Sequence, residues 1–252
     1  MRLNKKIIAD LANFIQMRYN ISIADYQEQY PDLYKSFLRM HYWMDEAILD
    51  TYFNGENKEG WTQQDRWETR KTGKQLLDKI SDLQDLSPEV PLKIIDIGCG
   101  NNNWKEHLGA KLTGIDPYNA KADFKIGINE YYETQKANDL LEKYDVALVL
   151  GSINFGDIAE IEKQIWEAVQ LVKLGGKIYW RCNPGISHAN PKAQWIDFFP
   201  WSAEFIKEIA HRTNCTVDEI SWDHDEPHHK RLYSEWTRNK TLASAKEIKT
   251  TV

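Results

Sequence analysis

The chain has 252 residues, of which 42% are hydrophobic and 28% are charged, and its formal net charge is −6. This length suffices for one large core, or for a core with a smaller cap. The negative net charge argues against a surface built throughout to bind the phosphate backbone of nucleic acids. No hydrophobic run approaches the ~20 residues that a bilayer crossing needs, and the N-terminus lacks a signal-peptide core, so we expect a cytoplasmic protein with no membrane anchor.

Cysteine usage favours the same compartment. The chain has three cysteines, Cys99, Cys182 and Cys215, at wide spacings and without a Cys-x-x-Cys pair. An odd number in this pattern argues against a disulfide framework and against a zinc site, so we predict reduced thiols and no metal. Nothing in the sequence indicates the oligomeric state.

The N-terminal part of the chain is predicted to be helical. Hydrophobic residues recur at helical spacing through much of 1–60, and we interpret this region as a cap that ends in a polar break rich in Gly and Asn. Another helix is predicted over about 63–83, ending before Pro88. The aromatic residues of the cap could form a lid over a small bound molecule, although a role in the core of the cap is the favoured interpretation.

After Pro91, short hydrophobic runs alternate with amphipathic segments, a pattern typical of βαβ units and of a parallel sheet with helices on both faces. Strands are predicted near 93–97, 112–115, 123–126, 145–150, 177–181, 216–222 and 231–237, and helices near 130–142, 158–172 and 202–212. We expect Gly175 to supply the positive φ that ends the helix at 158–172. The last two strands, joined by a polar segment, are predicted to form a hairpin.

The predicted fold is therefore a doubly wound, mostly parallel seven-stranded α/β sheet with a C-terminal antiparallel hairpin strand and an N-terminal helical cap. The predicted boundaries are a cap at 1–60, a domain that contains the sheet at 61–240 and a tail at 241–252.

The first chemical signal follows the first predicted strand, in the run Asp96-Ile97-Gly98-Cys99-Gly100. Two glycines after a buried strand let the backbone turn sharply and let a ligand approach where a Cβ would collide. Twenty positions after Asp96, the next strand ends at Asp116. A carboxylate at that place can accept hydrogen bonds from both hydroxyls of a ribose. Together the two sites predict an adenosine-containing cofactor.

At these residues the sequence resembles the class I methyltransferases that depend on S-adenosylmethionine (SAM). The resemblance covers nearly everything after Lys93, with the run at Asp96 as the family's first motif and Leu174-Gly175-Gly176-Lys177 as the turn before its fifth strand. One departure is Asn102, which stands where the family usually has glycine. Asparagine tolerates positive φ better than other non-glycine residues, so we expect the turn to survive.

The resemblance implies SAM as the cofactor and a set of contacts from neighbouring turns. Cys99 lies inside the motif and is interpreted as a small packed side chain, not a nucleophile. Trp67 and Arg70, on the helix before the sheet, either close over the cofactor or, as we favour, pack on the domain. The remaining implied contacts are Asn101 and Asn102 after the glycines, Pro117 and Tyr118 after Asp116, Ile128 and Asn129 by the adenine, and Gly151, Ser152 and Ile153 at the methyl-donor end.

Candidate catalytic residues come from two places. Asn154 ends the turn at the methyl-donor end and is a candidate for positioning the acceptor. The polar segment between the last two strands contains His224, His228 and His229, and we hypothesise that His224 or His229 orients the acceptor or removes its proton, because histidine titrates near neutrality. A solvated turn is the alternative. A metal site is disfavoured, because the adjacent His228 and His229 cannot easily point at one ion.

The acceptor is not named by the sequence. Neither Asn-Pro-Pro-Tyr nor Pro-Cys follows the fourth strand, which disfavours methylation of base amino groups and methylation at C5 of pyrimidines through a cysteine adduct. A small molecule is favoured over a macromolecule. Two other classes of function stay open. The protein could bind SAM without turnover, since methyl transfer needs no fixed catalytic residue. A nicotinamide-dependent oxidoreductase is disfavoured, because Asn103 occupies the third glycine position of its fingerprint.

Overall fold

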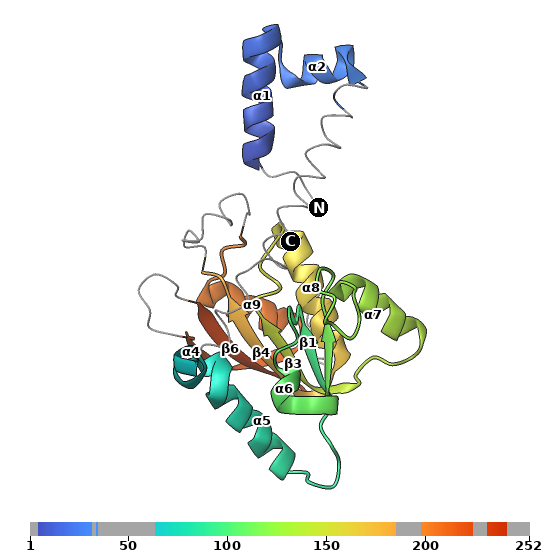
Figure 1. Ribbon diagram of the computed structural model, residues 1–252, viewed down its shortest axis with the longest axis vertical. Coiled ribbons are helices and arrows are strands. Elements are labelled where there is room, and N and C mark those ends of the chain that lie inside the picture. Colours follow the sequence, from blue (N-terminus) through green and yellow to red (C-terminus); the bar gives the residue numbers. More distant parts are fainter. Residues whose placement is uncertain (1–4, 32–33, 35–63, 185–197, 224–230, 241–252) are drawn as a thin grey trace, which may run out of the picture. The chain divides into compact units, whose positions relative to one another are not determined.

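The chain divides into two compact units, one of which contains the sheet. The computed structural model describes residues 5–31, 34, 64–184, 198–223 and 231–240. Among the described residues, the smaller unit contains 5–31 and 34, and the larger unit contains 64–184, 198–223 and 231–240 (Figure 1). The predicted domain boundaries remain predictions.

The described part of the N-terminal unit is helical, as its hydrophobic spacing predicts. It contains α1 (Lys5–Tyr19) and α2 (Ile23–Gln29). Ser22 begins α2 with a capping box, in which its side chain accepts a hydrogen bond from the Asp25 N–H and the Asp25 carboxylate accepts one from the Ser22 N–H. The buried side chains of this small core are Ile15 and Tyr26. The aromatic residues predicted further along the cap lie outside the described residues.

The larger unit has a mixed sheet with the strand order β2-β1-β3-β4-β6-β5. The first four strands pair in parallel, and β6 is antiparallel to both of its neighbours. The strands are β1 (Ile94–Ile97), β2 (Leu112–Ile115), β3 (Tyr144–Leu150), β4 (Val172–Cys182), β5 (Cys215–Trp222) and β6 (Leu232–Arg238). The mostly parallel sheet with a terminal antiparallel hairpin is confirmed.

Helices cover both faces of the sheet, because side chains of the strands alternate between two cores. On one face α7 (Ile128–Ala137), α8 (Ile158–Leu171) and α9 (Ala203–Arg212) pack on Ala147, Val149, Ile178 and Trp180, among others. The other face is covered by α5 (Leu76–Asp85) (Figure 1). Side chains of α5 and the ring of Trp104 pack there on Val146, Leu148 and Tyr179. This division confirms the doubly wound arrangement.

The strand predicted at 123–126 is reduced to a single bridge, so the described residues form six strands and not seven. Phe124 bridges Ile115 in parallel at the edge of β2. The carboxylate of Asp123 accepts the Gly114 N–H at 2.8 Å, and the Gly114 carbonyl accepts the Asp123 N–H at 2.9 Å. These contacts converge on one residue of β2, and a longer ladder does not form.

The helix predicted over 63–83 is broken. It consists of α4 (Gln64–Thr69) and α5, separated by a π-type turn in which Thr72 and Gly73 have non-helical backbone angles. A Cβ on Gly73 would lie 2.1 Å from the carbonyl oxygen of Trp67, so a side chain there is excluded by the close approach of α4.

The predicted end of the helix at 158–172 is also corrected. α8 ends at Leu171, and Gly175 adopts its positive φ of 84° inside β4. The pairing of β3 with β4 jumps from Tyr144↔Val172 to Val146↔Lys177, so the chain makes an excursion between these two pairs. Gly175 therefore serves a bulge of the strand and not the end of a helix.

Candidate functional site

The glycine turn after β1 has one packed side and one open side. The Gly98 and Cys99 N–H groups both donate to the Ile115 carbonyl, at 2.8 and 3.0 Å, which ties the turn to the end of β2. Gly98 has a φ of 72°, and a Cβ there would lie 2.1 Å from the Cβ of Ser152. Gly100 has a φ of 54°, and a Cβ there would meet no atom of the part of the chain that the structure describes within 4 Å. The space beside Gly100 is therefore free for a ligand.

Asn102 adopts a positive φ of 58°, as expected for an asparagine in a glycine position. Its side-chain amide is buried and donates from Nδ2 to the carbonyl of Lys121 at 3.1 Å. The departure from the family's pattern thus preserves the turn.

Asp116 organises the two turns that face each other across β1 and β2. Its carboxylate accepts the Gly100 N–H at 3.0 Å and the Tyr118 and Asn119 N–H groups at 2.8 and 2.9 Å. Asn119 adds a second link, because its Nδ2 donates to the side-chain oxygen of Asn101 at 2.9 Å. The sequence prediction missed Asn119; an Asp followed three positions later by Asn is a turn signal that could have found it.

Two buried carboxylates stand beside this turn. Asp96 is 3% exposed and Asp116 is 5% exposed. Burial, and to a lesser extent the negative charge of Asp116, raise the pKa of Asp96 to about 7. Among the described residues neither carboxylate forms a salt bridge with Lys or Arg. The electrostatic environment therefore favours a ligand that brings positive charge.

Burial also raises the pKa of the Cys99 thiol, with the neighbouring carboxylates as further causes. A thiol held protonated is a poor nucleophile, in agreement with its interpretation as a packed side chain.

The turn after β3 packs against the glycine turn. Gly151 has a φ of 110°, the hydroxyl of Ser152 donates to the Ile97 carbonyl, and Ile153 is buried. The side-chain oxygen of Asn154 accepts the Asn183 N–H at 2.8 Å, which connects this turn to the segment after β4. Asn154 is thereby fixed as part of the scaffold of the turn, and its predicted role toward an acceptor stays a prediction.

The remaining predicted contacts are spread around the carboxyl ends of the strands. Ile128 and Asn129 begin α7, the first buried and the second exposed. Pro117 is exposed and Tyr118 is half-buried, directly after Asp116. Whether any of these side chains touches a cofactor stays a prediction.

Trp67 packs on the helix that follows the glycine turn. Its ring stacks on His107 at 4.3 Å between centroids and lies 5.1 Å from Trp104, at the start of α6 (Lys105–Leu108). Arg70 is 6% exposed, at the turn between α4 and α5. These positions agree with packing on the domain, while contact with a cofactor remains a prediction for both residues.

The histidines predicted to act on the acceptor, His224 and His229, and the neighbouring His228 lie outside the described residues. The strand before them runs in the predicted direction: β5 is antiparallel to β6 and therefore parallel to β4. Its last residue, Trp222, is at the carboxyl edge of the sheet, where ligands bind in open α/β folds.

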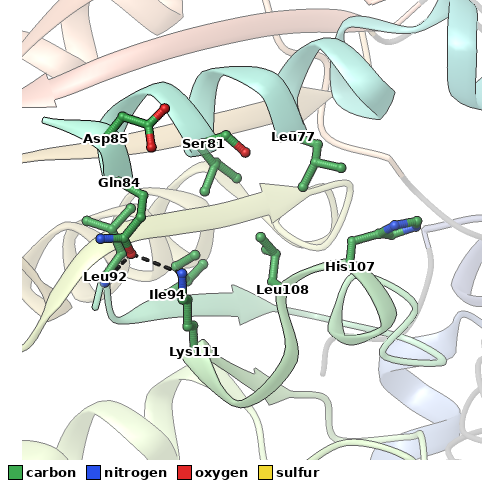
Figure 2. A pocket seen from close by; sticks show the side chains of 10 residues that line it. Leu77, Ser81, Gln84, Asp85, Leu92, Ile94, His107, Leu108 and Lys111 are labelled. Carbon is green, nitrogen blue, oxygen red and sulfur yellow. Dashed lines mark hydrogen bonds between the residues drawn. The ribbon is translucent and has the colours of Figure 1, made fainter. Parts of the chain in front are cut away.

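A cavity of about 180 Å³ lies between α5 and α6, over the start of β1 (Figure 2). At its wall, Gln84 accepts hydrogen bonds from Lys111 Nζ and the Leu92 N–H, both at 3.0 Å. The residues that line it include Leu77, Ile80, Ile94, His107 and Leu108. None of the predicted site residues lines this cavity, so it is separate from the candidate cofactor site.

No protein-family model and no curated protein sequence matches the chain. Solved structures do match. One is 1,6-didemethyltoxoflavin-N1-methyltransferase of Burkholderia thailandensis with 1,6-didemethyltoxoflavin and S-adenosylhomocysteine bound, with a TM-score of 0.53 and 13% identity over 78% of this chain and 89% of that one. Another is magnesium protoporphyrin IX methyltransferase of Synechocystis PCC 6803 with SAM bound, with a TM-score of 0.47 and 15% identity over 77% and 97% of the two chains.

The sheet topology and the match to the methyltransferase of Burkholderia thailandensis indicate the same fold. The strand order ends in an antiparallel pair, and the turns after β1, β2 and β3 meet at the carboxyl edge. No helix in the described ranges is long and apolar enough to span a bilayer. The chain has the fold of the class I SAM-dependent methyltransferases.

Proposed function

We propose that the protein is a SAM-dependent methyltransferase that acts on a small-molecule acceptor. The observation that carries this proposal is the pair of buried carboxylates, Asp96 and Asp116, beside a glycine turn whose Gly100 side is open. SAM has a sulfonium and an ammonium against one carboxylate, so its net charge is positive. Such a ligand compensates the two buried negative charges.

The same charges argue against the nicotinamide alternative. A dinucleotide would bring two negatively charged phosphates to the turn after β1, next to Asp96 and Asp116. The ionised carboxylate of Asp96 would repel these phosphates, whereas a carboxylate at the position of Asp116 also binds the ribose of dinucleotides and does not discriminate. This electrostatic argument is independent of the missing third glycine.

The residues of the chain would hold the cofactor from three sides. Asp116 keeps one side of its carboxylate on the Tyr118 and Asn119 N–H groups, and its other oxygen, which accepts from Gly100, retains capacity for a ribose hydroxyl. The turn from Gly151 to Asn154 would lie at the methionine end. Bound SAM would supply an activated methyl group, and the chain would contribute alignment of the acceptor and exclusion of water.

A calorimetric titration tests the proposal. We expect SAM and S-adenosylhomocysteine to bind at one site per chain, and NADH not to bind. The ligand should also raise the melting temperature, because a ligand at 100 times its Kd stabilises a protein by about 2.7 kcal/mol. Binding of NADH in the absence of SAM binding would contradict the assignment.

Asp116→Asn tests the ribose contact within that site. Asparagine keeps one acceptor oxygen for the Tyr118 and Asn119 N–H groups, whereas alanine would leave all three N–H groups without the carboxylate. We expect the affinity for S-adenosylhomocysteine to fall by about 1.5–3 kcal/mol, the value of a charge-assisted hydrogen bond. Asp218→Asn, on the distant hairpin, is the control, and unchanged affinity in Asp116→Asn would remove this residue from the site.

The proposal extends to the class of the acceptor and to the residue that activates it. The small-molecule class agrees with the net charge of −6, and the neighbour from Burkholderia thailandensis has a small molecule bound with its cofactor product.

We propose His224 or His229 as the base that removes a proton from the acceptor. Alanine at the residue that acts as the base should remove most turnover while leaving cofactor affinity unchanged. Full turnover of both variants over pH 6 to 9 would exclude them. A cofactor-binding protein without turnover would bind SAM and give no methylated product with any fraction of a cell extract.

A cytoplasmic location and the domain boundaries at 1–60, 61–240 and 241–252 are part of the same proposal. They are supported by the composition and by the position of the sheet within the chain.

A further inference from the structure

The short helix α4 depends on its neighbours for its position. It has six residues, and isolated helices shorter than about 12 residues are marginal in water. Two sets of contacts hold it in place: the turn at its C-terminal end and the ring of Trp67. A change in either set is therefore expected to move or loosen α4.

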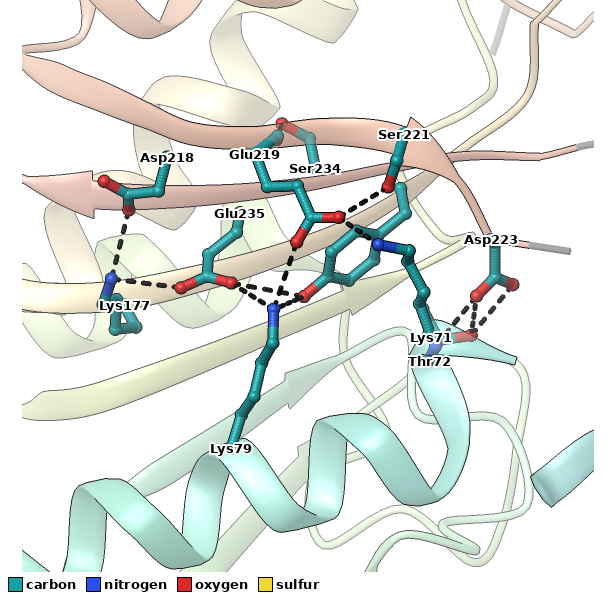
Figure 3. A network of polar contacts seen from close by, with 11 residues as sticks. Lys71, Thr72, Lys79, Lys177, Asp218, Glu219, Ser221, Asp223, Ser234 and Glu235 are labelled. Atoms are coloured by element: carbon teal, nitrogen blue, oxygen red, sulfur yellow. Dashed lines mark hydrogen bonds and ion pairs between the residues drawn. The ribbon is translucent and has the colours of Figure 1, made fainter. Parts of the chain in front are cut away.

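The turn after α4 is attached to the sheet by one buried carboxylate. Asp223 is 2% exposed, and its Oδ1 accepts the Thr72 N–H at 2.8 Å and the Thr72 hydroxyl at 2.9 Å (Figure 3). Its Oδ2 accepts from Arg181 Nε at 2.6 Å. The carbonyl of Asp223 also accepts the Lys71 N–H at 3.2 Å. We call Asp223, Thr72 and Arg181 the Asp223 clasp.

The clasp lies at the edge of the sheet that carries the cofactor turns. Asp223 directly follows β5, and Arg181 is the penultimate residue of β4. Because β5 runs parallel to β4, both residues are at carboxyl ends of strands, on the same edge as Gly98 and Asp116.

Trp67 connects the clasp to the glycine turn. On one side, Gly73 of the turn approaches the Trp67 carbonyl so closely that a Cβ would be 2.1 Å away. On the other side, the Trp67 ring stacks on His107 and contacts Trp104, which follows the glycine turn by four residues. A chain of direct contacts thus runs from Asp223 to the helix that begins beside the cofactor turn.

We propose that Asp223 is a positioning residue for the cofactor site, which it supports by holding α4 and Trp67 against the helix that follows the glycine turn. The inference rests on the proposed function, since it concerns the same SAM site. Its chemical basis is a buried carboxylate with hydrogen bonds from a hydroxyl, a backbone N–H and a guanidinium, and hydrogen bonds to a charged group are about twice as strong as neutral ones.

Thr72 offers a matched pair of variants that leaves the carboxylate itself in place. Thr72→Val keeps the shape of the side chain and removes the hydroxyl, whereas Thr72→Ser keeps the hydroxyl and removes a methyl group. Thr72 is 1% exposed, so valine preserves its packing. Asp218→Asn is the control, because Asp218 accepts hydrogen bonds from Lys177 of β4 and Thr237 of β6, and neither residue belongs to the clasp.

The experiment measures two quantities on each full-length variant: the Kd of S-adenosylhomocysteine by calorimetry, well below the melting temperature, and hydrogen exchange of the backbone of α4 without ligand. We expect Thr72→Val to raise the Kd by about tenfold and to speed exchange in α4, as follows from the loss of a hydrogen bond to a charged group. Thr72→Ser and Asp218→Asn should match the unmodified protein in both quantities.

The possible outcomes separate this inference from the proposed function. If the unmodified protein binds S-adenosylhomocysteine and Thr72→Val has the same Kd, the clasp is scaffold alone and the inference is overturned, whatever happens to the melting temperature. An equal loss in Thr72→Ser overturns it as well, because the hydroxyl would then not be responsible. If the unmodified protein does not bind the ligand, the proposed function fails and this inference fails with it.

Discussion

Acidic side chains occur in two contrasting settings in the larger unit. Beside the glycine turn, Asp96 and Asp116 are buried, and the pKa of Asp96 is raised to about 7. On the β5–β6 hairpin, Glu219 and Glu235 lie among lysines of α4–α5 and β4 (Figure 3). There the hydrogen bonds from Lys71, Ser221 and Lys79 lower the pKa of Glu219 to about 2, against the opposing effect of burial.

The contrast separates a binding site from a scaffold. Carboxylates that have their cations within the chain stabilise the fold and have no need of a ligand. Buried carboxylates without such a partner cost stability, and natural proteins keep costs of this kind mainly at functional sites. Carboxylates therefore indicate a ligand site beside β1 and β2, whereas on β5 and β6 they belong to a network of ion pairs that stabilises the fold.

The largest effect is expected from a pair of glycine variants that separates the packed side of the turn from its open side. Gly98→Ala should destabilise the protein by about 2–5 kcal/mol, because it combines a positive φ with a collision against Ser152. The added Cβ of Gly100→Ala meets no atom of the described residues within 4 Å, so this variant should cost about 1 kcal/mol from its φ of 54°. Thermal unfolding of both variants measures this difference.

The affinity of Gly100→Ala for the cofactor tests whether a ligand binds at the open side of the turn. Gly100→Ala should weaken S-adenosylhomocysteine by at least about tenfold, or about 1.4 kcal/mol, since its methyl group would fill the open side of the turn. An unchanged Kd in a well-folded Gly100→Ala variant would show that the ligand does not approach this glycine.

A smaller effect, with a pH signature, is expected for Asp96→Asn. The folded-state pKa of Asp96, about 7, lies above its ordinary value of 3.8, so its favourable contribution is present below about pH 4 and is lost as the pH rises through 7. Without the ligand, Asp96→Asn should therefore be more stable than the unmodified protein at pH 8, by about 1–3 kcal/mol. The difference should shrink toward pH 4, as calorimetric scans at several pH values can measure.

Bound SAM should favour the unmodified protein over Asp96→Asn. A cationic ligand favours the ionised carboxylate, so the affinity of the unmodified protein for SAM should rise between pH 6 and 8, and Asp96→Asn should bind SAM more weakly with a flatter profile. Equal pH profiles for the two proteins would refute the assignment of Asp96 as the group that compensates the ligand charge.

Features that depend on residues close together in the chain can be predicted from the sequence. β3 is continuously hydrophobic from Val146 to Leu150, and the spacing from Asp96 to Asp116 reflects two neighbouring parallel strands and the short crossover through α6, so local pattern is sufficient for both. The glycine turn is predictable for the same reason, because Asp96, Gly98 and Gly100 lie close together in the chain.

Features that depend on distant contacts were not predictable. Helical spacing predicts one helix over 63–83, but the chain turns at Thr72 because that residue binds Asp223, 151 positions later. Similarly, the sequence does not predict that the side-chain oxygen of Asn154 accepts the N–H of Asn183 at another strand end. In both cases the deciding partner is remote, and periodicity holds no information about it.

The smallest effect is expected on the hairpin, from Glu219→Gln. The pKa of Glu219 is depressed from 4.5 to about 2, so its ion pairs stabilise the protein above about pH 4.5, and this contribution is lost as the pH falls toward 2. The variant should lose about 1 kcal/mol at pH 7, a modest value because the side chain is partly exposed, and nothing at pH 2. Cofactor affinity should be unchanged, because the Lys71 N–H is still held by the Asp223 carbonyl. A loss of affinity in Glu219→Gln without a loss of stability would remove the distinction between scaffold and site carboxylates, since a carboxylate paired with lysines would then serve the ligand.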